Sequence, residues 1–104
     1  MSDKITLVVR FHMDESAKRE FTAKLQDVFA HIVQEETFVE ASLVQNLGDP
    51  GSILNYEVWN ESPESFMTNQ MSKAYREEFE KMIVELRIDR TPEWYSTIAE
   101  WKRA

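Results

Sequence analysis

Two kinds of hydrophobic periodicity follow one another along this chain, and their order limits the possible folds more than any other feature. Apolar residues recur at every second position over residues 5–12, which predicts a strand with one strongly apolar face. From about residue 14 to 35 they recur at spacings of three and four, without Gly or Pro, which predicts a helix. Strand patterns return over 38–47 and 52–60, and the turn Gly48-Asp49-Pro50-Gly51 between them indicates a hairpin.

The second half of the chain repeats the change from helix to strand. Ser62-Pro63 is a helix start, and a short helix and then a longer one are expected up to about residue 88. The segment Asp89–Pro92 is expected to end the second helix, and Glu93–Trp101 is the last predicted strand. The order predicts an α+β fold of the ferredoxin-like β-α-β-β-α-β type, a four-stranded antiparallel sheet with helices on one face.

A chain of 104 residues is long enough for one hydrophobic core, so residues 1–104 are expected to form a single domain. Both sides of most predicted strands carry large apolar groups. The sheet face away from the helices is therefore not polar enough to be plain solvent surface. A second copy of the chain is the expected cover for that face, which predicts a homodimer.

Charge and composition exclude several classes of function. The formal net charge is −7, with no basic stripe, so nucleic acid and anionic membranes are disfavoured as partners. The chain has no cysteine, so disulfides, thiolate nucleophiles and cysteine metal sites are excluded. No apolar run approaches the roughly 20 residues of a membrane span. The polar segment Met1–Lys4 does not read as a signal peptide, so a cytoplasmic location is expected.

The strand predicted over 52–60 carries the most suggestive side chains. Asn55, Glu57 and Trp59 share one face of it, and the alternate set Leu54, Tyr56 and Val58 suits a helix-covered face. The first set is therefore expected to point away from the helices, into a cavity on the sheet. An amide, a carboxylate and an indole in a row could orient and stack on a flat aromatic ligand. The alternative is that Trp59 is a core or interface aromatic and Asn55 satisfies backbone groups.

The two histidines offer little further chemistry. His12 ends the first predicted strand and could act as a general base near a cavity, although an exposed strand-end residue is the plainer interpretation. His31 lies at the edge of the first helix's apolar stripe, where a structural role is expected. Their spacing does not match a metal-ligand pair, so no metal site is predicted.

One stretch resembles a known family. Residues 35–59 read Glu-Glu-Thr-Phe-Val-Glu, then Gly-Asp-Pro-Gly, then Tyr56-Glu57-Val58-Trp59, and a helical segment follows over 61–71. This is similar to the antibiotic biosynthesis monooxygenase family, which includes small quinol monooxygenases. The resemblance implies a dimeric α+β barrel, in which the sheets of two copies face each other.

The resemblance also implies an activity and a set of site residues. It implies an oxidoreductase, a monooxygenase that oxidises a small aromatic substrate of the quinol or anthrone type with O2 and needs no cofactor. In some anthrone-oxidising members an Asn and a Trp four residues apart lie in the active site, and Asn55 and Trp59 have that spacing. Trp59 would stack on the ring, Asn55 would hydrogen-bond a substrate oxygen, and Glu57 or His12 would take a proton.

The sequence departs from the family downstream of this strand. Many members have a histidine in the following helix, and here Asn69 stands in that region, as a candidate substrate-binding residue. The missing histidine argues against haem degradation. It also keeps a second interpretation open, a non-catalytic dimeric barrel that binds a small hydrophobic ligand or acts in a stress response.

Overall fold

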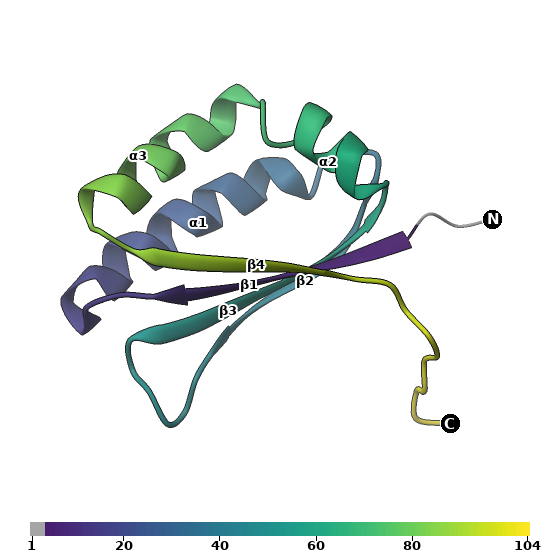
Figure 1. The fold of residues 1–104 in the computed structure, drawn as a ribbon, viewed down its shortest axis with the longest axis horizontal. Helices are drawn as coiled ribbons and strands as arrows, with labels where there is room; N and C mark the ends of the chain where they lie inside the picture. The colour runs from purple at the N-terminus through teal and green to yellow at the C-terminus, as the bar shows by residue number, and fades with distance from the viewer. Residues whose placement is uncertain (1–3) are drawn as a thin grey trace.

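The computed structural model describes residues 4–104 and contains the predicted order of elements. The strands are β1 (Lys4–His12), β2 (Phe38–Gln45), β3 (Ser52–Asn60) and β4 (Asp89–Tyr95), and the α-helices are α1 (Lys18–Ile32), α2 (Pro63–Asn69) and α3 (Glu77–Glu85). Short 3-10 turns at Glu15–Ala17 and Ala74–Arg76 precede α1 and α3. The strands pair antiparallel in the order β2-β3-β1-β4, and the helices lie on one face of this sheet (Figure 1). The predicted α+β, ferredoxin-like fold is confirmed.

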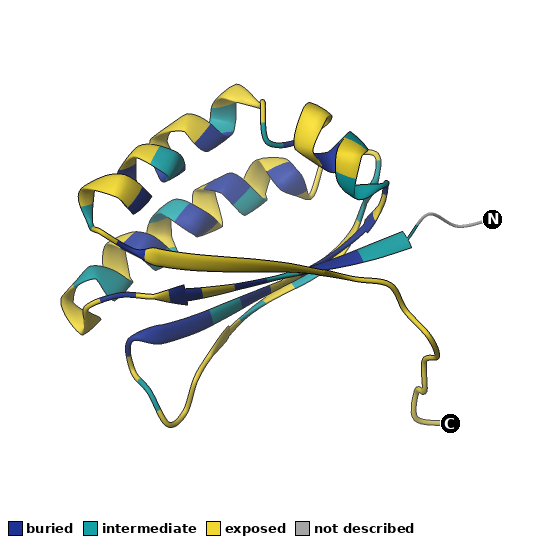
Figure 2. Cartoon of the chain, viewed as in Figure 1, coloured by how far each residue is buried: buried dark blue, intermediate teal, exposed yellow. Residues whose placement is uncertain are grey.

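The core fills the space between the sheet and the two longer helices. Each helix turns one apolar stripe toward the sheet, so its buried and exposed residues alternate along the ribbon (Figure 2). Aromatic rings join the layers: Phe11 of β1 lies 4.8 Å from Phe21 of α1, and Phe21 lies 5.8 Å from Phe79 of α3, between ring centroids. This packing places one face of the central strands β1 and β3 against the helices, whereas every residue of the edge strand β4 is exposed.

The face of β3 that meets the helices is the opposite of the one predicted. Asn55 pairs directly with Val9, and Glu57 with Leu7, and residues that pair directly across antiparallel strands share a face. Val9 and Leu7 belong to the core, so Asn55, Glu57 and Trp59 also lie on the helix-covered face. The prediction failed because a period of two separates two sets of residues without saying which set is covered.

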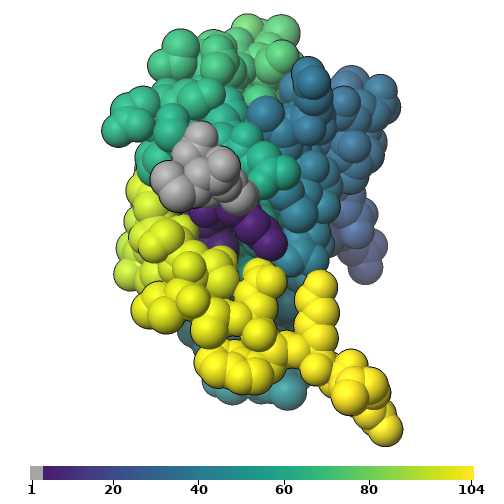
Figure 3. Space-filling model, turned by 90° about the vertical axis from the view of Figure 1, so that its right-hand side faces the viewer, coloured from purple at the N-terminus to yellow at the C-terminus, as the bar shows by residue number. Residues whose placement is uncertain are grey.

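The last strand begins earlier than predicted. The left-handed residue Arg87, with φ of 52°, follows the end of α3, and β4 then runs from Asp89 to Tyr95 instead of Glu93 to Trp101. Pro92 was expected to break structure, but β4 lies at the edge of the sheet, where a strand tolerates a residue without a backbone N–H. The remaining residues form an extended C-terminal segment that projects from the body of the molecule (Figure 3).

Two further sequence expectations concern the chain's surroundings. The expectation that Met1–Lys4 is not a signal peptide concerns mainly residues 1–3, which lie outside the described residues. Within residues 4–104, no helix combines the length and apolar character needed to cross a membrane.

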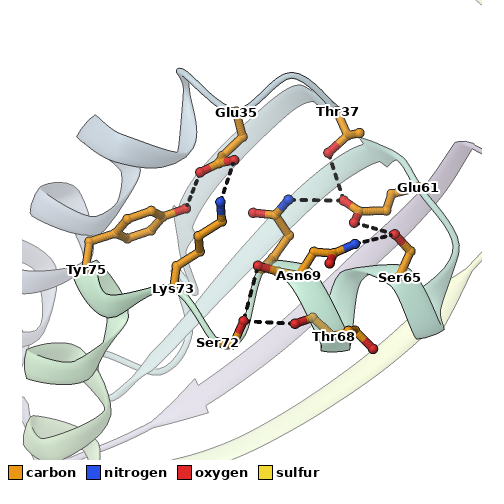
Figure 4. Close-up of polar contacts among 10 residues, drawn as sticks. Glu35, Thr37, Glu61, Ser65, Thr68, Asn69, Ser72, Lys73 and Tyr75 are labelled. Carbon is orange, nitrogen blue, oxygen red and sulfur yellow. Dashed lines mark hydrogen bonds and ion pairs between the residues drawn. The ribbon is translucent and has the colours of Figure 1, made fainter.

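A carboxylate at the end of β3 ties the hairpin to α2. Glu61 accepts hydrogen bonds from Thr37 Oγ1 at 2.8 Å and Ser65 Oγ at 2.6 Å, and from Gln70 Nε2 at 3.3 Å (Figure 4). Burial by itself would raise the pKa of Glu61, but the hydrogen bonds, first those from Ser65 and Thr37, outweigh it and hold the pKa below its ordinary value of 4.5. The cluster holds the start of α2 in place beside the sheet.

Replacing Glu61 by Gln should lower the free energy of unfolding by about 1–2 kcal/mol at pH 7, because donors lose a charged acceptor. A group whose pKa is lower in the folded state stabilises the fold above its unfolded pKa of 4.5, and this contribution is lost as the pH falls through the folded value. The difference between E61Q and the native chain should therefore shrink below about pH 4. Urea denaturation at several pH values measures it, with the exposed Glu36→Gln as control. A difference that is constant with pH would contradict this account.

Candidate active site

A cavity of about 320 Å³ lies between the helices and the sheet. Apolar side chains of β1 and α1 make up much of its wall, among them Leu7, Val9, Phe11, Leu25, Val28 and Ile32. Five polar or charged side chains also reach it: Asn55, Glu57, Arg76, Glu80 and Arg90. An apolar cavity with a few converging polar groups is the usual form of a small-molecule site. This cavity lies under the helices, and it is not the cavity that was predicted on the open face of the sheet.

Three side chains of β3 form a hydrogen-bonded chain at this cavity. Asn55 Nδ2 donates to Glu57 Oε2 at 2.6 Å, and Trp59 Nε1 donates to Glu57 Oε1 at 2.8 Å. All three side chains are buried. Burial raises the pKa of Glu57, and the hydrogen bonds from Trp59 and Asn55 and the charge of Arg76 only partly offset this rise. Glu57 is therefore a stronger base, when ionised, than an exposed carboxylate.

Four buried side-chain polar atoms of the described residues have no hydrogen-bond partner. Among the described residues, these atoms are Asn55 Oδ1, Gln70 Oε1, and Nε and Nη2 of Arg76. Buried polar groups in native proteins are nearly always paired, so an unpaired one at a cavity wall is suited to a ligand. Asn55 and Arg76 both line the cavity.

Two arginines line the cavity, and they differ in their partners. Arg90 of β4 donates from both terminal nitrogens to Glu80 of α3 at 2.8 Å, and this pairing lowers the pKa of Glu80. Arg76 is only 9% exposed, and its guanidinium lies 5.5 Å from the centre of the Phe66 ring. Arg76 was missed in the sequence analysis. This residue directly precedes α3 and stands three residues before the buried Phe79, and residues at that spacing share one side of a helix. The spacing could therefore have indicated that Arg76 faces the core.

Aromatic rings close one part of the site. Phe66 and Trp94 line the cavity and meet edge to face, with ring centroids 5.3 Å apart. Trp59 lies behind Phe66, 5.2 Å away, is fully buried and does not itself line the cavity. The expected stacking of a ligand on Trp59 is thus not what the geometry offers, and Phe66 and Trp94 take that place. Trp94 was missed because its contact with Phe66 joins two elements that are distant in the sequence.

Two predicted site residues lie elsewhere. His12 is on the opposite face of the sheet, where its exposed ring lies 3.4 Å from Asp49, Nε2 to Oδ2. Asn69 donates to Ser65 Oγ at 3.0 Å, beside the Glu61 cluster and away from the cavity (Figure 4). The structure therefore brings together Asn55, Glu57 and Trp59 without His12 or Asn69. Across residues 4–104, no group of three His, Asp or Glu side chains is placed to hold a metal ion.

Comparison with known proteins points to one family and one fold. The family described as antibiotic biosynthesis monooxygenase matches residues 4–81. Comparison with curated proteins gave no match to this chain. Among solved structures, SnoaB, a cofactor-independent oxygenase from Streptomyces nogalater, is similar with a TM-score of 0.79 at 16% identity, covering 98% of this chain and 100% of that one.

A second similar structure is a putative antibiotic biosynthesis monooxygenase from Nitrosomonas europaea. Its TM-score is 0.80 at 11% identity, and the match covers 94% of this chain and 93% of the other. A third, with the same description, comes from Caulobacter crescentus, with a TM-score of 0.80 at 12% identity over 94% and 92% of the two chains. At such low identity these likenesses concern the fold.

Proposed function

The chain belongs to the antibiotic biosynthesis monooxygenase family, and on this premise we propose that it oxidises a small aromatic substrate of the quinol or anthrone type with O2. The observation that carries the proposal is the buried chain of Asn55, Glu57 and Trp59 at the wall of an apolar cavity. A cavity of about 320 Å³ suits a small aromatic molecule, and its Phe66 and Trp94 rings offer apolar surfaces to one.

The residues support a reaction in which the protein prepares the substrate and O2 itself is the oxidant. Glu57 accepts a proton from the substrate, and the unpaired Asn55 Oδ1 accepts a hydrogen bond from a substrate hydroxyl. The resulting electron-rich anion gives one electron to O2, and the two radicals recombine to a peroxide. For an anthrone, the methylene carbon becomes a ketone with one oxygen atom of O2. The other oxygen atom leaves as water, which carries the two hydrogens of the former methylene. The apolar cavity wall keeps water from the reacting anion.

Oxygen consumption with a panel of quinols and anthrones tests the proposal. We expect uptake of one O2 per anthrone oxidised, above the rate of the substrate in buffer, with the ketone product confirmed by mass spectrometry. The same rate with heat-denatured protein would overturn the proposal, because an unfolded chain has no cavity.

A second candidate function is ligand binding without catalysis. Both oxygens of Glu57 already accept hydrogen bonds from within the chain, which favours a structural role for this carboxylate. Saturable binding of aromatic compounds by the folded protein without oxygen uptake would support this function over the first.

The proposal includes a homodimer. The sheet face away from the helices exposes apolar or aromatic side chains of three strands, Val44, Tyr56 and Tyr95, and the projecting C-terminal segment exposes Ile98 and Trp101. Large apolar side chains exposed on one sheet face favour a partner that covers them. A second copy that covers this face would form the two-sheet barrel.

Sedimentation equilibrium should give a mass of twice 12.3 kDa. Tyr56→Asp, which places a charge on the open sheet face, should weaken the association at least tenfold, because a buried unpaired charge is costly. The control Val84→Asp, on the exposed side of α3, should leave it unchanged. A native mass near 12.3 kDa at micromolar concentration would contradict the dimer.

A further inference from the structure

We infer that the cavity selects aromatic ligands that carry an anionic group, a carboxylate in the simplest case, and that Arg76 binds this group. The inference concerns the same cavity as the proposed function. It rests on that function only for the statement that the ligand is a substrate. It names a chemical class within the aromatic compounds considered above.

Arg76 is a buried cation, and two of its three guanidinium nitrogens have no hydrogen-bond partner. It is more than nine-tenths buried, it lines the cavity, and its Nε and Nη2 have no partner. Among the ion pairs of residues 4–104, none involves Arg76. A guanidinium can donate two parallel hydrogen bonds to one carboxylate. A buried guanidinium with unpaired N–H groups is costly, so a ligand that brings an anion gains hydrogen bonds that the chain itself leaves unmade.

The acidic groups that share the cavity do not supply this anion. Glu80 is held on both oxygens by the two terminal nitrogens of Arg90. Glu57 accepts hydrogen bonds on both oxygens, from Asn55 and Trp59. Each carboxylate is thus hydrogen-bonded to other residues of the chain, and Nε and Nη2 of Arg76 remain without a partner at the cavity wall.

The surroundings of Arg76 indicate an aromatic carrier for the anion. Its guanidinium lies over the ring of Phe66, and Phe66 and Trp94 form the adjoining aromatic part of the wall. A ligand with a ring bonded to a carboxylate can therefore place the ring against these side chains while the carboxylate meets Arg76. The cation–π contact holds the guanidinium plane without using its N–H groups.

Calorimetric titration of the native protein with two matched probes tests the inference. Naphthoate and naphthalenemethanol share the ring system and the position of substitution, and differ in charge. We expect naphthoate to bind at least tenfold more tightly, since a charge-assisted pair in a buried site contributes that much. Equal affinity of the two probes, or tighter binding of the alcohol, would overturn the inference without any variant.

Three variants then assign the preference to Arg76. Arg76→Gln should reduce the ratio of the two affinities to within about twofold, and Arg76→Lys, which keeps a point charge, should retain part of it. Arg19→Gln removes a positive charge from the exposed side of α1 and should leave the ratio unchanged. A tenfold preference that survives in R76Q, folded by circular dichroism, would overturn the assignment.

Binding and oxygen uptake can fail separately. Preferred binding of naphthoate with no oxygen uptake from any quinol or anthrone would keep the anion site and remove the oxygenase proposal. Oxygen uptake from neutral substrates, together with equal binding of the two probes, would keep the oxygenase and remove the anion site.

Discussion

Replacing Trp59 by Ala is expected to lower the free energy of unfolding by about 3–5 kcal/mol, the largest stability loss that we expect from a change at this site. Trp59 has no exposed surface and contacts the rings of Phe38 and Phe66 at 5.3 and 5.2 Å between centroids. The truncation leaves a void among these rings, and it also removes the indole N–H that holds Glu57 Oε1. A loss of this size is a large part of the roughly 5–15 kcal/mol that stabilises a typical domain.

Urea denaturation followed by circular dichroism measures this loss. Leu47→Ala is the control, because that side chain is 99% exposed in the hairpin loop and its removal should change the stability by less than about 0.5 kcal/mol. A similar small change for Trp59→Ala would mean that the indole does not support the wall of the cavity.

Replacing Asn55 by Ala is expected to lower kcat/KM for oxygen-dependent turnover about 100-fold while the protein stays folded. The amide has two functions in the proposed reaction. Its Nδ2 holds Glu57 Oε2 at 2.6 Å, and its unpaired Oδ1 is available to a substrate hydroxyl. The variant loses both, so the proton acceptor and the substrate are each less well oriented.

Oxygen consumption with the best substrate of the panel measures the effect. Asn46→Ala is the matched control, because its side chain accepts a hydrogen bond from Gly48 N in the hairpin turn, outside the cavity lining. Its turnover should stay within twofold of the native rate. Full activity of the Asn55 variant would remove this residue from the reaction and favour the binding function.

The order of the elements could be predicted because hydrophobic periodicity is a local property. The stripe in α1 and the alternation in β1 each depend on residues within a few turns or positions of one another. The last strand was misplaced for the same reason. Pro92 reads locally as a breaker, and only its position on an edge strand makes it compatible with the sheet.

The candidate site was predicted in part. The hydrogen-bonded chain of Asn55, Glu57 and Trp59 contains three residues that the sequence singles out. His12 did not join them, because it stands an odd number of positions along β1 from the residues that face the helices, and side chains alternate between the two faces of a strand. Arg76 and Trp94 were missed, because each comes to the cavity from an element distant in sequence.

The strand Ser52–Asn60 marks where sequence and tertiary structure divide. The sequence by itself determined that this segment is a strand, that it follows a hairpin turn, and that Asn55, Glu57 and Trp59 share a face. Only the tertiary structure decided that this face lies under α1, α2 and α3 and that Arg76 reaches the same cavity. The physical reason is that a side chain's neighbours across a core depend on strand pairing and helix packing, which join residues far apart in the chain.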